Sequence, residues 1–162
     1  MARKVFFSFH YDNDVWRANV VRNSWVTKTD KQAAGFMDAA DFEELKKKGK
    51  AAIEKWIDDQ LVGTTVTVVL IGSETIQRPF VQYELKKSYE RGNGILGVYI
   101  DQIGDKNGKT TTRCSIYGVE LGKDSSGTVV NFSSKPVYDW KSQDGYNKLG
   151  DWVEATAKAA GK

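Results

Sequence analysis

The segment from Val66 to Ile100 constrains the fold more than any other, because strand, turn, helix and strand follow one another in it without an ambiguous gap. The run VTVVLIG (66–72) is β-branched and aliphatic, which is typical of a strand buried on both faces of a parallel sheet. Pro79 suits the first turn of a helix from about 78 to 91. GILGVYI (94–100) then returns as a second buried strand, so the segment predicts a right-handed βαβ unit.

The predicted helix has an apolar stripe that should face the sheet. The stripe consists of Val81, Leu85, Ser88 and Tyr89, and the side chains expected in water are Gln82, Lys86 and Glu90. Glu84 belongs to neither set, because it lies at the edge of the stripe beside Phe80. On helical pattern alone, exposure to water or a pair with a nearby lysine such as Lys87 stays the simpler alternative for this carboxylate.

The N-terminal residues predict another strand and helix. KVFFSF (4–9) favours a short aromatic strand. The apolar residues after it recur at helical spacing as far as Trp25, with Asp12 or Asn13 as the expected cap. Strand therefore precedes helix here as well.

The segment between these two units is less regular. Residues 27–32 are polar and predict a loop, and the apolar centre of AAGFMDAADF (33–42) favours an edge strand. Residues 42–61 carry apolar side chains along one face, which indicates an amphipathic helix weakened by Gly49.

After Ile100, residues 101–134 predict an irregular insertion with a hairpin near TVVNF. PVYDW (136–140) favours a last short strand, and a C-terminal helix follows it. The whole chain, 1–162, predicts a single α/β domain: a flavodoxin-like, doubly wound open sheet of about five mainly parallel strands with helices on both faces.

Composition excludes several classes of site and partner. Cys114 is the only cysteine, which rules out an intramolecular disulfide and fits a reducing cytosol. The 24 basic and 21 acidic residues leave a net charge of +3, too mild to indicate a nucleic-acid partner. The apolar run VFFSF is too short for a signal peptide or a membrane span. We therefore expect a cytoplasmic protein that binds neither nucleic acid nor membrane.

Ligands of open parallel sheets bind outside the carboxyl ends of the strands, near the point where the strand order reverses. The side chains expected there are Ser8, Phe9, His10 and Tyr11 after the first strand, Ser73 and Glu74 after strand 66–72, Phe36, Asp38 and Asp41 from the loop 33–42, and Glu84 from the helix. For His10, a structural imidazole is the simpler interpretation.

Several familiar motifs are absent or misplaced. Ser8 and His10 lie two residues apart, so the serine-hydrolase pair that they nominally form is not favoured. GDKNGKT (104–110) imitates the end of a phosphate-binding P-loop, but its glycine spacing is one residue short and no helix follows. One histidine and one cysteine cannot form a His-rich zinc site, and we expect neither a metal nor a bound cofactor.

Longer motifs carry a resemblance along nearly the whole chain. They are VFFSFHY, NVVRNSWVTK, GFMDA, VTVVLIGSETIQRPFVQYEL, ERGNGILGVYI and VYDWKSQDGYNKLGDWV. Their order and spacing together resemble the TIR-like domains of the Thoeris anti-phage defence family.

The resemblance implies a TIR enzyme that consumes NAD⁺ as substrate and makes a cyclic ADP-ribose isomer as an immune signal. In such enzymes one glutamate lies on the helix after the third sheet strand, and Glu84 in RPFVQYEL matches it. It would contact the hydroxyls of the nicotinamide-bearing ribose. The resemblance also implies an effector protein that reads the signal, a phage component as trigger, and self-association as one option.

The remaining site residues follow from their strand-end positions. Aromatic side chains expected around nicotinamide and adenine are Phe9, Tyr11, Phe36 and Phe80, and the polar contacts expected are Ser8, His10 and Ser73. The competing hypothesis is a non-catalytic TIR-like adaptor or nucleotide-binding module.

Overall fold

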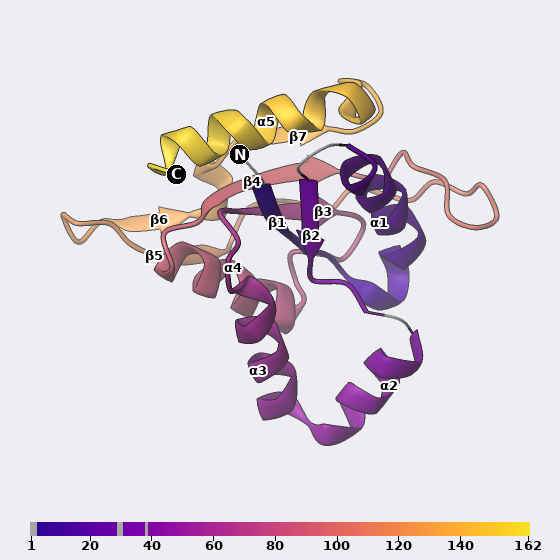
Figure 1. Ribbon diagram of the computed structural model, residues 1–162, viewed down its shortest axis with the longest axis horizontal. Helices are drawn as coiled ribbons and strands as arrows, with labels where there is room; N and C mark the ends of the chain where they lie inside the picture. Colours follow the sequence, from indigo (N-terminus) through magenta and orange to yellow (C-terminus); the bar gives the residue numbers. More distant parts are fainter. Residues whose placement is uncertain (1–2, 29–30, 38) are drawn as a thin grey trace.

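The computed structural model describes residues 3–28, 31–37 and 39–162, and a five-stranded parallel sheet lies at its centre (Figure 1). In spatial order the strands are β2 (Lys31–Ala34), β1 (Arg3–Ser8), β3 (Val66–Ile71), β4 (Gly94–Tyr99) and β7 (Val137–Asp139). Every neighbouring pair is parallel. This is the strand order of flavodoxin-like folds, so the predicted fold class is confirmed.

Helices cover both faces of the sheet (Figure 1). On one face lie α1 (Tyr11–Val26) and α5 (Gly145–Ala159), and on the other lie α3 (Lys50–Leu61) and α4 (Pro79–Glu90). Side chains of β1 alternate between the two layers: Phe7 packs with Trp25 of α1, whereas Phe6 belongs to the cluster that contains Ile57 of α3. All six residues of β3 are buried, as the aliphatic run predicts for a central strand.

A buried polar bridge ties α4 to β3. The hydroxyl oxygens of Thr67 and Ser88 lie 2.6 Å apart, and the Ser88 hydroxyl donates to the backbone carbonyl of Glu84 over 2.7 Å. Ser88, Val81 and Leu85 are buried, which confirms the inward stripe at these positions. Since α4 begins at the carboxyl edge of the sheet, Glu84 lies one turn closer to that edge than Ser88.

Two predictions near the first helix need correction. The cap of α1 is His10, not Asp12 or Asn13, because β1 ends at Ser8 and the helix starts within three residues. The edge strand is Lys31–Ala34 rather than a strand within 33–42, so part of the predicted loop is strand. An edge strand tolerates polar residues, because its pairing with β1 uses backbone groups.

The single helix predicted over 42–61 is also wrong. Gly49 has a φ of 95° and separates α2 (Ala39–Lys48) from α3. A residue in this left-handed region cannot continue a right-handed helix. The chain therefore turns at Gly49, and α2 stands beside α3 at the periphery of the molecule (Figure 1).

The hairpin expected between 101 and 134 is present. It consists of β5 (Glu120–Lys123) paired antiparallel with β6 (Val129–Asn131), and a short 3₁₀ turn, Phe132–Ser134, follows. In the part of the chain that the structure describes, no helix has the length and apolarity needed to cross a bilayer.

Two glycine positions give a stability test with opposite signs. Gly35 has a φ of 91°, and a Cβ there would clash with the backbone oxygen of Phe7, whereas a Cβ at Gly150 in α5 would have no other atom within 4 Å. Gly35→Ala should lower the free energy of unfolding by about 1–3 kcal/mol from backbone strain alone. Gly150→Ala should raise it by up to about 1 kcal/mol through helix propensity. Urea unfolding of both variants checks this, and an unchanged midpoint for Gly35→Ala would contradict it.

Candidate functional site

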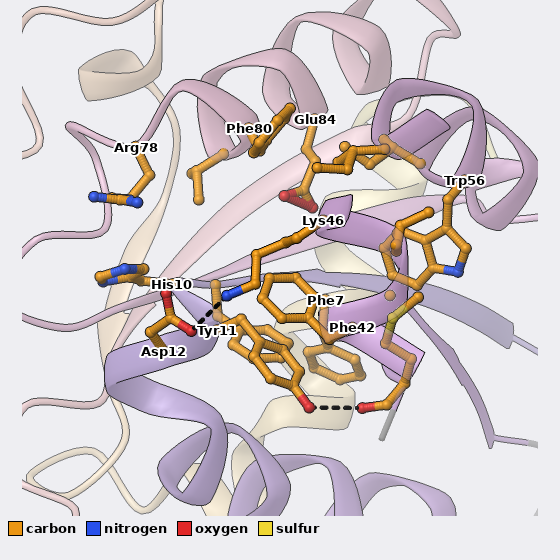
Figure 2. Close-up of a pocket in the computed structure, with 17 residues that line it drawn as sticks. Phe7, His10, Tyr11, Asp12, Phe42, Lys46, Trp56, Arg78, Phe80 and Glu84 are labelled. Atoms are coloured by element: carbon orange, nitrogen blue, oxygen red, sulfur yellow. Dashed lines mark hydrogen bonds and ion pairs between the residues drawn. The ribbon is translucent and has the colours of Figure 1, made fainter. Parts of the chain in front are cut away.

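A pocket lies at the carboxyl ends of β1 and β2, between α2, α3 and the start of α4 (Figure 2). It contains about 770 Å³ of space between atoms, part of it open to solvent. Ligands of flavodoxin-like sheets are expected at this position, outside the carboxyl ends of the strands.

Glu84 directs its carboxyl group into this pocket from α4 (Figure 2). The residue is only 7% exposed, and burial raises the pKa of the carboxyl well above its ordinary value of 4.5. The Ser8 hydroxyl opposes this rise as a nearby donor, although its Oγ makes no hydrogen bond of ordinary geometry within the described residues. Glu84 is thus a desolvated acid inside a cavity, not a solvated helix carboxylate.

Aromatic rings form much of the wall. Tyr11 stacks on Phe42 of α2 with ring centroids 4.0 Å apart, and its hydroxyl donates to the backbone carbonyl of Met37 over 3.0 Å. The ring centroid of Phe9 lies 6.0 Å from that of Tyr11, and Phe80 lines the pocket next to Glu84 (Figure 2). These flat apolar surfaces suit the faces of heteroaromatic rings.

Cationic side chains lie at the mouth. Lys46 of α2 reaches over the Phe42 ring and pairs with Glu43 at 2.8 Å and Asp12 at 3.7 Å. Arg78 precedes α4, and its side chain lies near His10 (Figure 2). The pocket therefore has a buried acid at one end and basic groups around its opening.

His10 lines the pocket and is 7% exposed. Burial lowers the pKa of its imidazole, and the positive charge of Arg78 lowers it further. Its Nδ1 has no hydrogen-bond partner in the described residues, and the nearest carboxylate oxygen, Oε2 of Glu74, is 3.9 Å away.

A buried ion pair supports the turn that carries His10. Asp14 accepts a hydrogen bond from Nη1 of Arg17 over 3.0 Å, and burial raises the pKa of the Asp14 carboxyl. Arg17 also donates to the backbone carbonyls of Ile103 and Lys109, each over 2.7 Å. One guanidinium thus joins the start of α1 to the segment after β4.

The structure brings together most of the residues expected at the site. Those that line the pocket are Phe9, His10, Tyr11, Phe80 and Glu84. Ser8 is fully buried beneath them. Phe36 packs behind Phe9, with centroids 5.1 Å apart, and neither it nor Ser73 belongs to the lining. Asp41 is exposed, and Asp38 lies outside the described residues.

Among the lining residues that were not foreseen as parts of a site are Phe42, Lys46, Trp56 and Arg78. Three of these four lie in the segment that was predicted as one continuous helix. The turn at Gly49, which brings α2 over the pocket, is the signal that would have placed them.

No cluster of three or more His, Cys, Asp or Glu side chains suited to a metal ion occurs within residues 3–28, 31–37 and 39–162.

The raised pKa of Glu84 predicts a pH-dependent effect of Glu84→Gln on stability. Below pH 4.5, the ordinary pKa of a glutamate, the carboxyl is neutral in the folded and the unfolded protein, and its burial costs little. As the pH rises through the higher folded-state pKa, folding must bury a charge, so the free energy of unfolding decreases. The Gln variant should therefore unfold at higher urea concentration than the wild type at pH 8, with a smaller difference at pH 4.5. Glu90→Gln, at an exposed position of the same helix, should show no such trend. A pH-independent difference for Glu84→Gln would refute the assignment.

Comparison with known proteins places this fold and pocket in a family. The family model for "Thoeris protein ThsB, TIR-like domain" matches residues 6–105, more than half of the chain, and this range contains Glu84 and the other pocket-lining residues. A protein of Bacillus cereus (strain MSX-D12) named "Putative cyclic ADP-D-ribose synthase ThsB1" is 37% identical over 191 residues, a match that covers 94% of this chain and 100% of that relative. The chain therefore belongs to the ThsB family of Thoeris TIR-like domain proteins.

Proposed function

We propose that this protein is a TIR-type enzyme of bacterial anti-phage immunity that cleaves NAD⁺, releases nicotinamide and closes the remaining ADP-ribose into a cyclic isomer. The observation that carries the proposal is the buried carboxyl of Glu84, which points into an aromatic-lined pocket. Family membership supports it, as does the relative whose name describes a cyclic ADP-D-ribose synthase. The cyclic product would act as a diffusible signal for an effector protein.

Glu84 has the chemistry that this cleavage needs. Positive charge develops on the nicotinamide-bearing ribose as its bond to the ring nitrogen breaks, and a fixed carboxylate in a dry pocket stabilises that charge far better than water does. The cationic nicotinamide ring itself favours the ionised carboxylate when it enters. Nicotinamide leaves as a neutral molecule, so no general acid is required.

Cyclisation also requires the other half of the substrate to attack before water does. The enzyme must therefore fold the dinucleotide and exclude solvent, which is a problem of positioning. Phe9, Tyr11 and Phe80 supply apolar faces for the nicotinamide and adenine rings in this proposal, and Phe42 and Trp56 extend the wall. Ser8 lowers the pKa of the nearby Glu84 carboxyl, and because it is fully buried it is not proposed to touch the substrate.

Two further elements of the proposal concern regulation. A phage component is proposed as the trigger, and self-association as a means of completing the pocket. Tests of turnover should therefore include high protein concentration and lysate from phage-infected cells.

Glu84→Gln tests the catalytic role. The variant should release nicotinamide from NAD⁺ at least about a hundredfold more slowly than the wild type, the scale for removal of one preorganised electrostatic group. Chromatography with mass spectrometry measures nicotinamide and the cyclic product together. Glu90→Gln serves as the matched control and should retain wild-type turnover.

The alternative is a TIR-like adaptor that binds a partner or a nucleotide without turnover. It predicts that wild type and Glu84→Gln are equally inert, even with infected lysate added. That result would replace the enzyme proposal with the adaptor.

A further inference from the structure

We propose that Arg78 and His10 together bind the diphosphate of the dinucleotide at the start of α4, and so set which substrates place their ribose against Glu84. The identity of the ligand rests on the proposed function. The binding site itself rests on three observations at one end of the pocket.

The first observation is an arginine without an acid to pair with. Arg78 lines the pocket and is exposed at its mouth, and its guanidinium makes no hydrogen bond or ion pair within the described part of the chain. Lys46 differs, because Glu43 and Asp12 already neutralise it. A guanidinium offers several N–H groups in a planar fork, which matches two phosphate oxygens at once.

The second observation is the buried imidazole of His10. Only 7% of the residue is exposed, it lines the same pocket, and its Nδ1 lacks a hydrogen-bond partner among the described residues. Glu74 is a poor partner, because it is exposed, lies 3.9 Å away and accepts a 2.7 Å hydrogen bond from Asn13. Buried polar atoms in proteins are normally satisfied, and the described protein atoms leave this ring nitrogen free for a ligand or water molecule.

The third observation is the helix start between them. The N-cap of α4 makes no side-chain hydrogen bond, and the first turn contains no acidic residue. The first amides of a helix have no intrahelical acceptor and carry partial positive charge. Phe80 and Val81, which belong to this turn, line the pocket. An oxyanion here would meet free amides as well as the two side chains.

Arg78 also disfavours a positive charge on His10. Burial lowers the pKa of His10, and the charge of Arg78 lowers it further, which favours the neutral imidazole. Figure 2 shows both on the same side of the pocket, away from the Glu84 carboxyl. A diphosphate between them would accept hydrogen bonds from the guanidinium and from an imidazole N–H, and its negative charge would oppose the effect of Arg78 on His10.

The spacing along α4 suits a nucleotide. Arg78 and Glu84 are six residues apart, a rise of about 9 Å along the helix. One ribose with its C5′ oxygen separates the cleaved bond from the diphosphate in NAD⁺, so a ligand held at Arg78 can present that ribose to Glu84. A nucleoside without phosphate would make no contacts with Arg78 and His10, so these residues would not add to its affinity.

Calorimetric binding of ADP-ribose tests the proposal without turnover, because this probe has the diphosphate but no bond to nicotinamide. Arg78→Ala should bind it about ten- to a hundredfold more weakly than the wild type, the scale for hydrogen bonds to a charged group. Arg78→Lys should lie between the two, since it keeps the charge but loses the fork. Arg91→Ala, at an exposed position at the other end of α4, should bind like the wild type.

Adenosine is the phosphate-free control ligand, and its affinity should be equal for the wild type and Arg78→Ala. With NAD⁺ as substrate, Arg78→Ala should raise KM about ten- to a hundredfold and change kcat little, whereas Glu84→Gln lowers kcat. His10→Gln should weaken ADP-ribose binding but not adenosine binding, which separates a ligand contact from a loss of folding.

The outcomes distinguish this proposal from the proposed function. Equal affinity of wild type and Arg78→Ala for ADP-ribose, or no binding by the wild type at about 1 mM ligand, overturns the diphosphate site even if NAD⁺ is cleaved. Arg78-dependent binding without NAD⁺ cleavage supports the diphosphate site and counts against the enzyme.

Discussion

The contact between the hydroxyls of Thr67 and Ser88 determines how α4 lies on the sheet. Burial of Val81 and Leu85 holds α4 against the sheet, but apolar contacts are not directional and specify its rotation less strictly than a hydrogen bond does. A buried hydroxyl pair is directional, and breaking it would leave polar atoms unsatisfied. The pair therefore fixes the rotation of α4, and with it the direction of the Glu84 side chain one turn earlier.

The same helix orders the charges of the site. Its second turn holds the carboxyl deep in the pocket, and its start presents the guanidinium of Arg78 at the mouth. A dinucleotide with a cationic ring at one end of a ribose and a diphosphate at the other has the complementary order.

The central unit was predictable because its physical causes are local. A β-branched run, a proline at a helix start and a second apolar run specify β3, α4 and β4 without distant contacts. The outer wall was not, because the backbone conformation of Gly49 decides whether Phe42 and Lys46 lie over the pocket or along a continued helix. The strand-end rule located the edge of the sheet but not the direction of each turn residue, which is why Ser73 and Phe36 lie outside the lining.

The burial of Glu84 has a thermodynamic consequence for every ligand that enters its pocket. A carboxyl with a raised pKa keeps its proton to a higher pH than an exposed glutamate does, so at a pH below that pKa a cationic ligand must displace the proton to pair with the carboxylate. Below the pKa of that carboxyl, affinity for a cationic ligand should fall about tenfold for each unit by which the pH decreases. The affinity for a neutral ligand of the same shape should not change with pH. Selectivity for charge is thus a property of the apolar walls as much as of the acid they enclose.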